Sequence, residues 1–222
     1  MLYIVGTAIG NINDTTYRAA KTLSEANVIL VEDTRSFSSY YKRILELFKF
    51  SAIPEQKIIP FHDQNEFEQT PYILKLLENN TQVALVSEAG VPLISDPGSF
   101  LLQQVIKNNI PYTVVPGPSA LTTALALSGY SGKEPVIFLG FLPKKEQAVK
   151  KILGQYEGVI VFYESAERID KTLQIINEIM PTAQVCICRE MTKKFEEIAR
   201  GTAKDLLGRK YKGELTVVLF SK

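Results

Sequence analysis

Short apolar runs alternate with longer amphipathic stretches along this sequence, and this alternation constrains the fold more than any other feature. Runs such as Leu2–Val5 and Val28–Val31 have the length of single buried strands, and the polar residues 14–16 provide a helix cap between them. Strands that alternate with helices predict an α/β architecture whose first sheet is mostly parallel.

The segment Pro116-Gly117-Pro118-Ser119 is the sharpest turn signal in the chain. We therefore expect two domains, an N-terminal α/β domain over residues 1–115 and a C-terminal α/β domain over residues 116–222. In the second half the last apolar runs follow one another closely, so its sheet is expected to be mixed, with some antiparallel strands. A helix is also expected to begin at Pro71, because proline is favoured in a first helical turn.

Composition is that of a globular protein, with 45% hydrophobic and 22% charged residues among 222. No apolar run approaches the ~18 residues that cross a membrane, and the N-terminus has no signal-peptide pattern. The formal net charge is only +1, whereas tight nucleic-acid binding usually needs a basic excess. Any contact with RNA must therefore come from a local patch or from a second subunit.

Cys186 and Cys188 occupy alternate positions of an apolar run, so they point to the same face of a strand, which is poor geometry for a disulfide. With His62 as the only histidine, a zinc site is not expected. We interpret both cysteines as reduced core residues, which indicates a cytoplasmic location.

Polar segments follow several expected strands, and ligands of open α/β sheets bind outside the carboxyl ends of strands. The turn at residues 6–11 has two glycines but matches neither a dinucleotide nor a triphosphate motif, so it is either a binding loop or a plain turn. Residues 32–35 suit substrate contact or acid–base work, or else an N-cap with a salt bridge. His62 is a candidate base, because imidazole exchanges protons near neutral pH, although a lone histidine is more often structural.

The loop at residues 87–98 is rich in glycine and proline, and long ordered loops at strand ends commonly bind ligands. In the second half, residues 139–143, 163–165 and 189–193 each follow an expected strand and together suit one wall of a cleft. None of these three segments is specific by itself.

Taken in order, these segments resemble the tetrapyrrole-methylase superfamily, and within it the ribosomal RNA small-subunit methyltransferase I family. The matching stretches, which span nearly the whole chain, are LYIVGTAIGNINDTTYRA, VEDTR, FHDQNE, ALVSEAGVPLISDPG, VVPGPSA, FLGFLPKK, VFYESAERI, CREMTKKFEE and GELTVV. The resemblance implies two α/β domains, a homodimer, and S-adenosylmethionine bound in a cleft between the domains. It also implies methylation of a cytidine ribose 2′-oxygen in the decoding region, so the expected partner is small-subunit ribosomal RNA or the assembled small subunit.

The residues expected around S-adenosylmethionine lie in the loops that match the family, and they are Glu88, Ala89, Gly90, Val91, Pro92, Ile94, Ser95, Asp96, Pro118, Ser119, Ala120, Gly140, Phe141, Leu142, Glu190 and Gly213. A weakly nucleophilic ribose hydroxyl benefits from a base, for which Asp33, His62 and Glu66 are the candidates. Arg35 and Lys193 are expected to hold a phosphate or the attacking oxygen. A sulfonium is itself electropositive, so no metal is expected.

The sequence departs from the family pattern at Ala8, Gln64, Glu88, Val91 and residues 166–167. Family members also tend to continue into a C-terminal extension; if that extension holds RNA, weaker RNA binding is expected here. Two alternatives remain open. One is a methylase of a tetrapyrrole or other small molecule, against which the GTAIGN, VEDTR and FHDQNE stretches argue. The other is a non-catalytic protein that binds S-adenosylmethionine.

Overall fold

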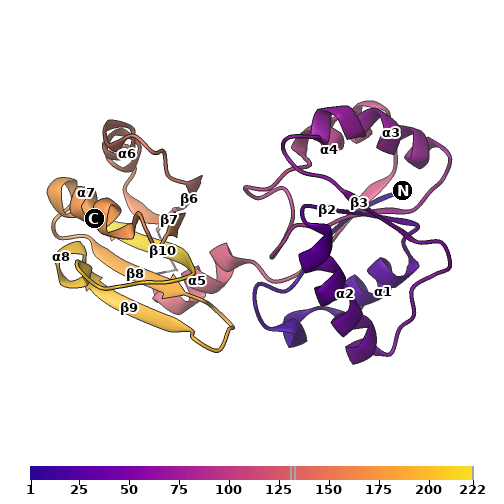
Figure 1. Ribbon diagram of the computed structural model, residues 1–222. Coiled ribbons are helices and arrows are strands. Elements are labelled where there is room, and N and C mark those ends of the chain that lie inside the picture. Colours follow the sequence, from indigo (N-terminus) through magenta and orange to yellow (C-terminus); the bar gives the residue numbers. More distant parts are fainter. Residues whose placement is uncertain (131, 133, 222) are drawn as a thin grey trace. The chain divides into compact units, whose positions relative to one another are not determined.

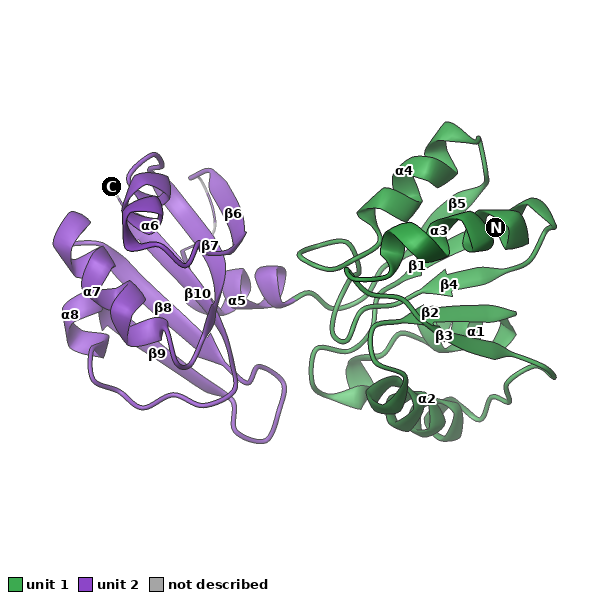
Figure 2. Cartoon of the chain, turned by 45° about the horizontal axis from the view of Figure 1, so that its top comes forward, with its two compact units in different colours: residues 1–119 green, residues 120–222 purple. Residues whose placement is uncertain are grey.

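The computed structural model describes residues 1–130, 132 and 134–221, and the chain forms two compact units, residues 1–119 and 120–222 (Figure 1; Figure 2). The division falls between Ser119 and Ala120, just after a strand that ends at Val115, whereas the sequence placed it near residue 115. No helix in the described part of the chain is long and apolar enough to cross a membrane.

Unit 1 is built on a five-stranded sheet in the order β3-β2-β4-β1-β5, and every neighbouring pair is parallel. Its elements are β1 (Leu2–Val5), the 3-10 helix η1 (Ile12–Asp14), α1 (Tyr17–Glu25), β2 (Val28–Val31), α2 (Thr34–Phe48), β3 (Lys57–Pro60), α3 (Glu66–Glu78), β4 (Val83–Leu85), α4 (Ser99–Lys107) and β5 (Tyr112–Val115).

Helices cover both faces of this sheet, α1 and α2 on one side and α3 and α4 on the other (Figure 2). Strand β2 shows why, because all four of its residues are buried. Ile29 and Val31 pack against the first helix pair, while Val28 and Leu30 pack against the second. A strand buried on both faces is typical of a parallel sheet between two helical layers.

Unit 2 is built on a second five-stranded sheet in the order β6-β7-β10-β8-β9, in which β6 and β7 are parallel and the other pairs antiparallel. The mixed sheet expected from the sequence is therefore confirmed. Its elements are α5 (Ala120–Ser128), β6 (Val136–Phe141), α6 (Glu146–Leu153), β7 (Gly158–Ser165), α7 (Ile169–Ile179), β8 (Gln184–Arg189), β9 (Glu197–Thr202), α8 (Ala203–Leu206) and β10 (Glu214–Ser221).

One face of the unit 2 sheet packs with α6, α7 and α8 around the main core, and the other face packs with α5. Cys186 and Cys188 are free and fully buried, and their sulfur atoms lie 3.8 Å apart. The Cys188 thiol also lies 4.0 Å from the Ala124 carbonyl of α5. Both thiols therefore point to the same face, as the sequence predicted.

The expectation that a helix begins at Pro71 is wrong, because α3 begins at Glu66 and Pro71 lies inside it. A proline within a helix removes one backbone hydrogen bond, which local preference alone disfavours. The earlier start is fixed by a tertiary contact, since the Glu66 carboxylate binds backbone amides at the beginning of α4.

Candidate functional site

Two loops of unit 1 approach each other backbone to backbone at Gly6 and Gly117. The Gly6 amide donates to the Val115 carbonyl at 2.9 Å. A Cβ added to Gly6 would lie 2.7 Å from the Gly117 nitrogen, and one added to Gly117 would lie 2.8 Å from the Gly6 carbonyl carbon. Both positions therefore require glycine, because neither backbone can retreat from a side chain.

The loop between β4 and α4 packs against the same pair. Its Gly90 carbonyl accepts from the Thr7 amide at 2.8 Å and from the Thr7 hydroxyl at 3.4 Å. A Cβ added to Gly90 would lie 3.4 Å from the Ile9 side chain and 3.4 Å from the Pro118 carbonyl oxygen, which is ordinary van der Waals contact. Three segments distant in sequence, residues 6–11, 87–98 and 116–118, therefore form one loop cluster in unit 1.

The β4–α4 loop contains two residues other than glycine with a strained backbone. Leu93 and Ser95 have φ values of 73° and 72°, a left-handed conformation uncommon for residues other than glycine. Strain of this kind persists only where the surrounding structure enforces it, and it is enriched at ligand sites. The loop holds half of the residues expected around the cofactor, from Glu88 to Asp96, including Ala89, Val91, Pro92 and Ile94.

Carboxylates from three strand ends of unit 1 influence one another. Burial raises the pKa of Glu32, at the end of β2, and the negative charges of Glu88 and Asp63 add to that effect. Burial likewise raises the pKa of Asp96 to about 7, and the charge of Glu32 adds to it. The described residues hold no group of His, Cys, Asp and Glu placed to bind a metal ion. A positive charge bound beside these carboxylates would relieve their mutual repulsion.

Two of the expected base candidates hold helix N-termini. Asp33 Oδ1 accepts from the amides of Arg35 at 2.7 Å and Ser36 at 2.8 Å, and these bonds lower the pKa of the Asp33 carboxyl. Glu66 is buried, and its Oε1 accepts from the amides of Gly98, Phe100 and Leu101 at 2.9–3.2 Å. These contacts cap α2 and α4.

His62 lies half-buried in the connection between β3 and α3. Its amide donates to the Asn65 side-chain oxygen at 2.8 Å, which fixes the turn, and its charge offsets a small part of the rise in the pKa of Glu32. Arg35 is exposed in the first turn of α2. The structure therefore places His62 near the Glu32 carboxylate, and Arg35 follows the end of β2 by four residues.

In unit 2, the segment after the bulge at the end of β6 is held by Arg168, the residue that precedes α7. Gly140 has φ 61°, and the register with β7 shifts between Phe138 and Phe141. The Arg168 guanidinium donates to the carbonyls of Leu142 at 3.1 Å and Pro143 at 2.8 Å. Phe141 remains 63% exposed and packs edge-on against Tyr163.

A buried carboxylate keeps Arg168 in place. Glu164 lies 3.4 Å from Arg168, and it also accepts from the Thr172 hydroxyl at 2.7 Å and the Ser165 amide at 2.8 Å. The shape of the segment that carries Gly140 and Leu142 therefore depends on Arg168 and Glu164.

Glu190, Gly213 and Lys193 form a second cluster in unit 2. Glu190 Oε1 accepts from the Glu214 amide at 3.1 Å and from Lys193 Nζ at 3.3 Å, and Lys193 also binds Glu214 at 2.5 Å. A Cβ on Gly213, whose φ is 84°, would overlap the Glu190 carboxylate. Burial opposes both charges, but these bonds outweigh it, so the pKa of Glu190 is lowered and that of Lys193 is raised.

From the sequence, Glu32 and Glu164 were included only within candidate segments, neither was given a role of its own, and Asp63 and Arg168 were not selected as site residues. Glu32 directly follows β2, and Glu88 lies three residues after the end of β4, so a position just beyond a strand was the available signal. Glu164 lies near the end of β7 and Arg168 directly before α7, and their spacing of four residues does not reveal the carbonyl partners of Arg168.

Comparisons with known proteins agree with this architecture. A family model described as tetrapyrrole (corrin/porphyrin) methylases matches residues 1–207. A relative from Thermotoga maritima, called ribosomal RNA small subunit methyltransferase I, is 43% identical over 227 residues, covering 100% of this chain and 98% of the relative. A relative of the same name from Coprothermobacter proteolyticus is 37% identical, covering 99% of this chain and 97% of the relative.

Solved structures show the same fold at low sequence identity. The cobalamin biosynthetic enzyme cobalt precorrin-4 methyltransferase aligns with a TM-score of 0.66 at 16% identity, covering 99% of this chain and 94% of that one. Uroporphyrin-III-C-methyltransferase from Thermus thermophilus aligns with a TM-score of 0.66 at 20% identity, covering 98% and 93%.

Proposed function

This chain belongs to the tetrapyrrole (corrin/porphyrin) methylase family, and from that membership we propose that it is an S-adenosylmethionine-dependent methyltransferase acting on small-subunit ribosomal RNA. We further propose that the methyl group goes to the 2′-oxygen of a cytidine ribose in the decoding region. The observation that carries the proposal is the full-length similarity, up to 43% identity, to relatives named for that RNA substrate.

The loop cluster of unit 1 fits the proposed cofactor. Backbone groups of the β4–α4 loop are held in place by Thr7 and by the contact between Gly6 and Gly117, and the nearby carboxylates suit a cationic ligand. Pro118, Ser119 and Ala120 would contribute at the connection to unit 2. From unit 2 itself, Gly140, Phe141, Leu142, Glu190 and Gly213 would contribute. When bound, S-adenosylmethionine supplies an electrophilic methyl group on a positively charged sulfur.

We assign His62 as the general base that accepts the proton of the attacking hydroxyl. Among the three base candidates, Asp33 and Glu66 already accept backbone amides of helix N-termini. These bonds lower the pKa of the Asp33 carboxyl, which makes it a weaker base, and they hold Glu66 Oε1 as the cap of α4. His62 lies beside Glu32, whose negative charge stabilises the imidazolium formed when a proton is accepted.

Cations are assigned to substrate binding rather than to proton transfer. Arg35 is exposed at the start of α2, where its guanidinium can form bidentate bonds with a phosphate. Lys193 is bound by two carboxylates, so we assign it to holding Glu190 against Gly213, with any contact to the attacking oxygen made from that position.

The proposed assembly is a homodimer, which light scattering coupled to size-exclusion chromatography would test directly. The free, buried Cys186 and Cys188 agree with a reducing compartment, and we place the protein in the cytoplasm.

The decisive experiment is methyl transfer from labelled S-adenosylmethionine to small ribosomal subunits that lack native methylation, with the labelled nucleotide mapped. Label on one cytidine ribose of the decoding region is the expected result. The fold is shared with enzymes named for cobalt precorrin-4 and uroporphyrin III, so methylation of a tetrapyrrole is the second candidate. Unlabelled RNA with tight cofactor binding would favour that candidate or a non-catalytic role.

A further inference from the structure

The near-zero net charge of the chain conceals opposite charges on its two units. Residues 1–119 contain nine Lys and Arg and twelve Asp and Glu, a formal charge of −3. Residues 120–222 contain sixteen and twelve, a formal charge of +4. An uneven charge distribution of this kind indicates an electrostatic role for the basic part.

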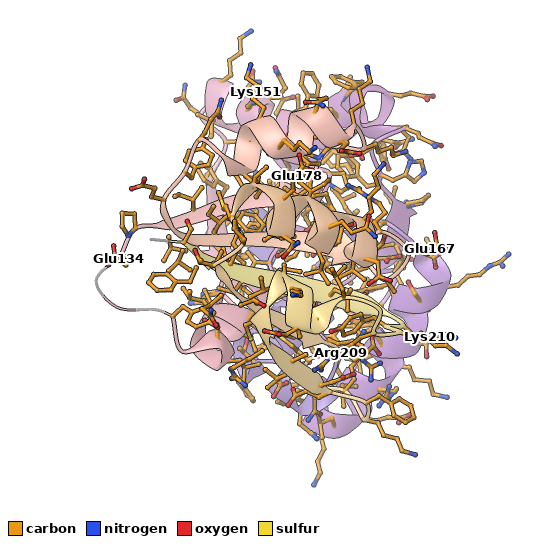
Figure 3. All side chains as sticks on the ribbon, turned by 90° about the vertical axis from the view of Figure 1, so that its left-hand side faces the viewer. Glu134, Lys151, Glu167, Glu178, Arg209 and Lys210 are labelled. Atoms are coloured by element: carbon orange, nitrogen blue, oxygen red, sulfur yellow. The ribbon has the colours of Figure 1, made fainter. Side chains whose placement is uncertain are left out.

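Three of the positive charges in unit 2 lie on one turn, residues 208–213, between α8 and β10. Arg209, Lys210 and Lys212 are all exposed, and Figure 3 shows Arg209 and Lys210 well apart from Lys151 of α6. Among the described residues, none of the three has a carboxylate oxygen within the 4.0 Å of an ion pair, unlike Lys150, Lys171 and Lys193.

The backbone of this turn is fixed at both ends. Gly208 donates its amide to Asp170 at 3.1 Å, and the Lys212 carbonyl accepts from Arg189 at 3.2 Å. Tyr211 is buried in the main core of unit 2, so the residues on either side of it point outward. The three cations are therefore presented by a held turn rather than by a loose loop.

Neighbouring carboxylates are engaged elsewhere. Asp205 caps α8 through the amide and hydroxyl of Thr202, at 2.9 Å and 2.6 Å. Glu190 and Glu214 bind Lys193. The charge of Arg209 also acts on Asp205 and helps to lower the pKa of that carboxyl. No ion pair in the described part of the chain holds Arg209, Lys210 or Lys212, so their charges remain accessible to an external partner.

We propose that the turn at residues 208–213 is a docking site for the sugar–phosphate backbone of the RNA substrate, a role that rests on the proposed function. Phosphates take charge-assisted bonds from guanidinium and ammonium groups, and cations on a held turn bind them with little loss of backbone entropy. Gly213 ends the turn and lies against Glu190, so bound RNA is directed toward the residues assigned to the cofactor.

The test compares two full-length variants with equal changes in charge. Arg209→Gln/Lys210→Gln/Lys212→Gln removes the turn's cations, and Lys144→Gln/Lys145→Gln/Lys151→Gln removes three cations of the same unit without an ion pair among the described residues. Binding to unmethylated small ribosomal subunits is measured from 50 to 250 mM KCl. The variant without the turn's cations should bind at least about tenfold more weakly than the wild type. The slope of its log affinity against log salt concentration should be smaller by about 2, at roughly 0.7 per lost phosphate contact.

Controls separate this docking site from folding and from the proposed function. S-adenosylmethionine affinity and the unfolding temperature should match those of the wild type, and Lys210→Arg/Lys212→Arg should retain the wild-type slope. Equal losses in both triple variants would overturn the inference, because they would reflect net charge alone. So would an altered oligomeric state with unchanged RNA binding, which would assign the turn to a protein contact. Wild-type protein that neither binds nor methylates RNA would reject the proposed function as well.

Discussion

Unit 1 and unit 2 each organise five strands, but they place their charge in opposite ways. In unit 1 all neighbouring strands are parallel, so the carboxyl ends of β2, β3 and β4 lie along one edge and bring Glu32, Asp63 and Glu88 together. In unit 2 most pairs are antiparallel, and exposed cations gather on the turn that leads into β10.

This difference shows why net charge was a poor guide to partners. A total of +1 argued against autonomous RNA binding, yet it is the sum of an acidic unit and a basic one. In our proposals the acidic strand ends serve a cationic cofactor and the basic turn serves RNA. The predictions below test that division of roles.

The largest expected effect concerns proton removal, which we assign to unit 1. His62→Ala should lower the turnover of bound RNA by roughly 100- to 10,000-fold, the usual contribution of a general base. Single-turnover methyl transfer at saturating cofactor measures this, with Gln64→Ala as a control at an exposed neighbouring position. If His62→Ala had wild-type turnover, His62 would not be the general base, and the assignment of proton removal to unit 1 would be wrong.

The next effect concerns stability. Glu66→Ala would leave three backbone amides at the start of α4 without their acceptor, and we expect a loss of about 3 kcal/mol in the free energy of unfolding. Glu66→Gln keeps an acceptor oxygen and should lose about 1 kcal/mol. Urea denaturation followed by circular dichroism distinguishes the pair. If the two variants were equally stable, Glu66 would be available for chemistry rather than for capping.

In unit 2 the matching structural test is at Gly213. Gly213→Ala should cost about 2 kcal/mol, because it adds a collision with Glu190 to the cost of a left-handed backbone. Gly208 has a similar φ of 77°, and nothing lies within 4 Å of a Cβ added there. Gly208→Ala should therefore lower the free energy of unfolding by only about 1 kcal/mol. Thermal unfolding of both variants measures the difference. Equal costs would mean that Glu190 moves aside freely.

The fold was largely predictable because its signals are local. Strands such as β1, β2 and β5 begin and end where the apolar runs do. The start of α3 was not predictable from local preference, because Glu66 is held by amides of residues 98–101, more than thirty positions along the chain.

Site residues were predictable as segments but not as roles. The resemblance selected the stretches that contain Asp33, His62 and Glu66. The sequence left an N-cap open as one role for residues 32–35, and Asp33 has that role, but nothing in the sequence indicates that Glu66 caps α4. Arg168 was missed for the same reason, since its partners are backbone carbonyls of Leu142 and Pro143. A pattern of side chains does not show which backbone groups need satisfying.

The smallest predicted effect concerns the pH dependence of cofactor binding at the acidic edge of unit 1. Burial and the charge of Glu32 raise the pKa of Asp96 to about 7, and Ser87, Asp63 and Glu88 also act on it. A cationic ligand favours the ionised carboxylate. Affinity for S-adenosylmethionine should therefore be highest above pH 7 and fall as pH drops through that value, by at most tenfold per pH unit. Calorimetric titration from pH 5.5 to 8.5 measures the dependence.

Asp96→Asn is the matched variant, because it keeps the size of the side chain but cannot ionise. It should bind S-adenosylmethionine with nearly constant affinity across the same range, at a level close to that of the wild type at low pH. A wild-type profile that strengthened with acid would have the opposite sign, and it would mean that the ligand's negative carboxylate, rather than its positive charges, faces Asp96. The acidic edge would then not serve as the cationic-ligand site of unit 1, while the RNA-docking proposal for unit 2 would still stand.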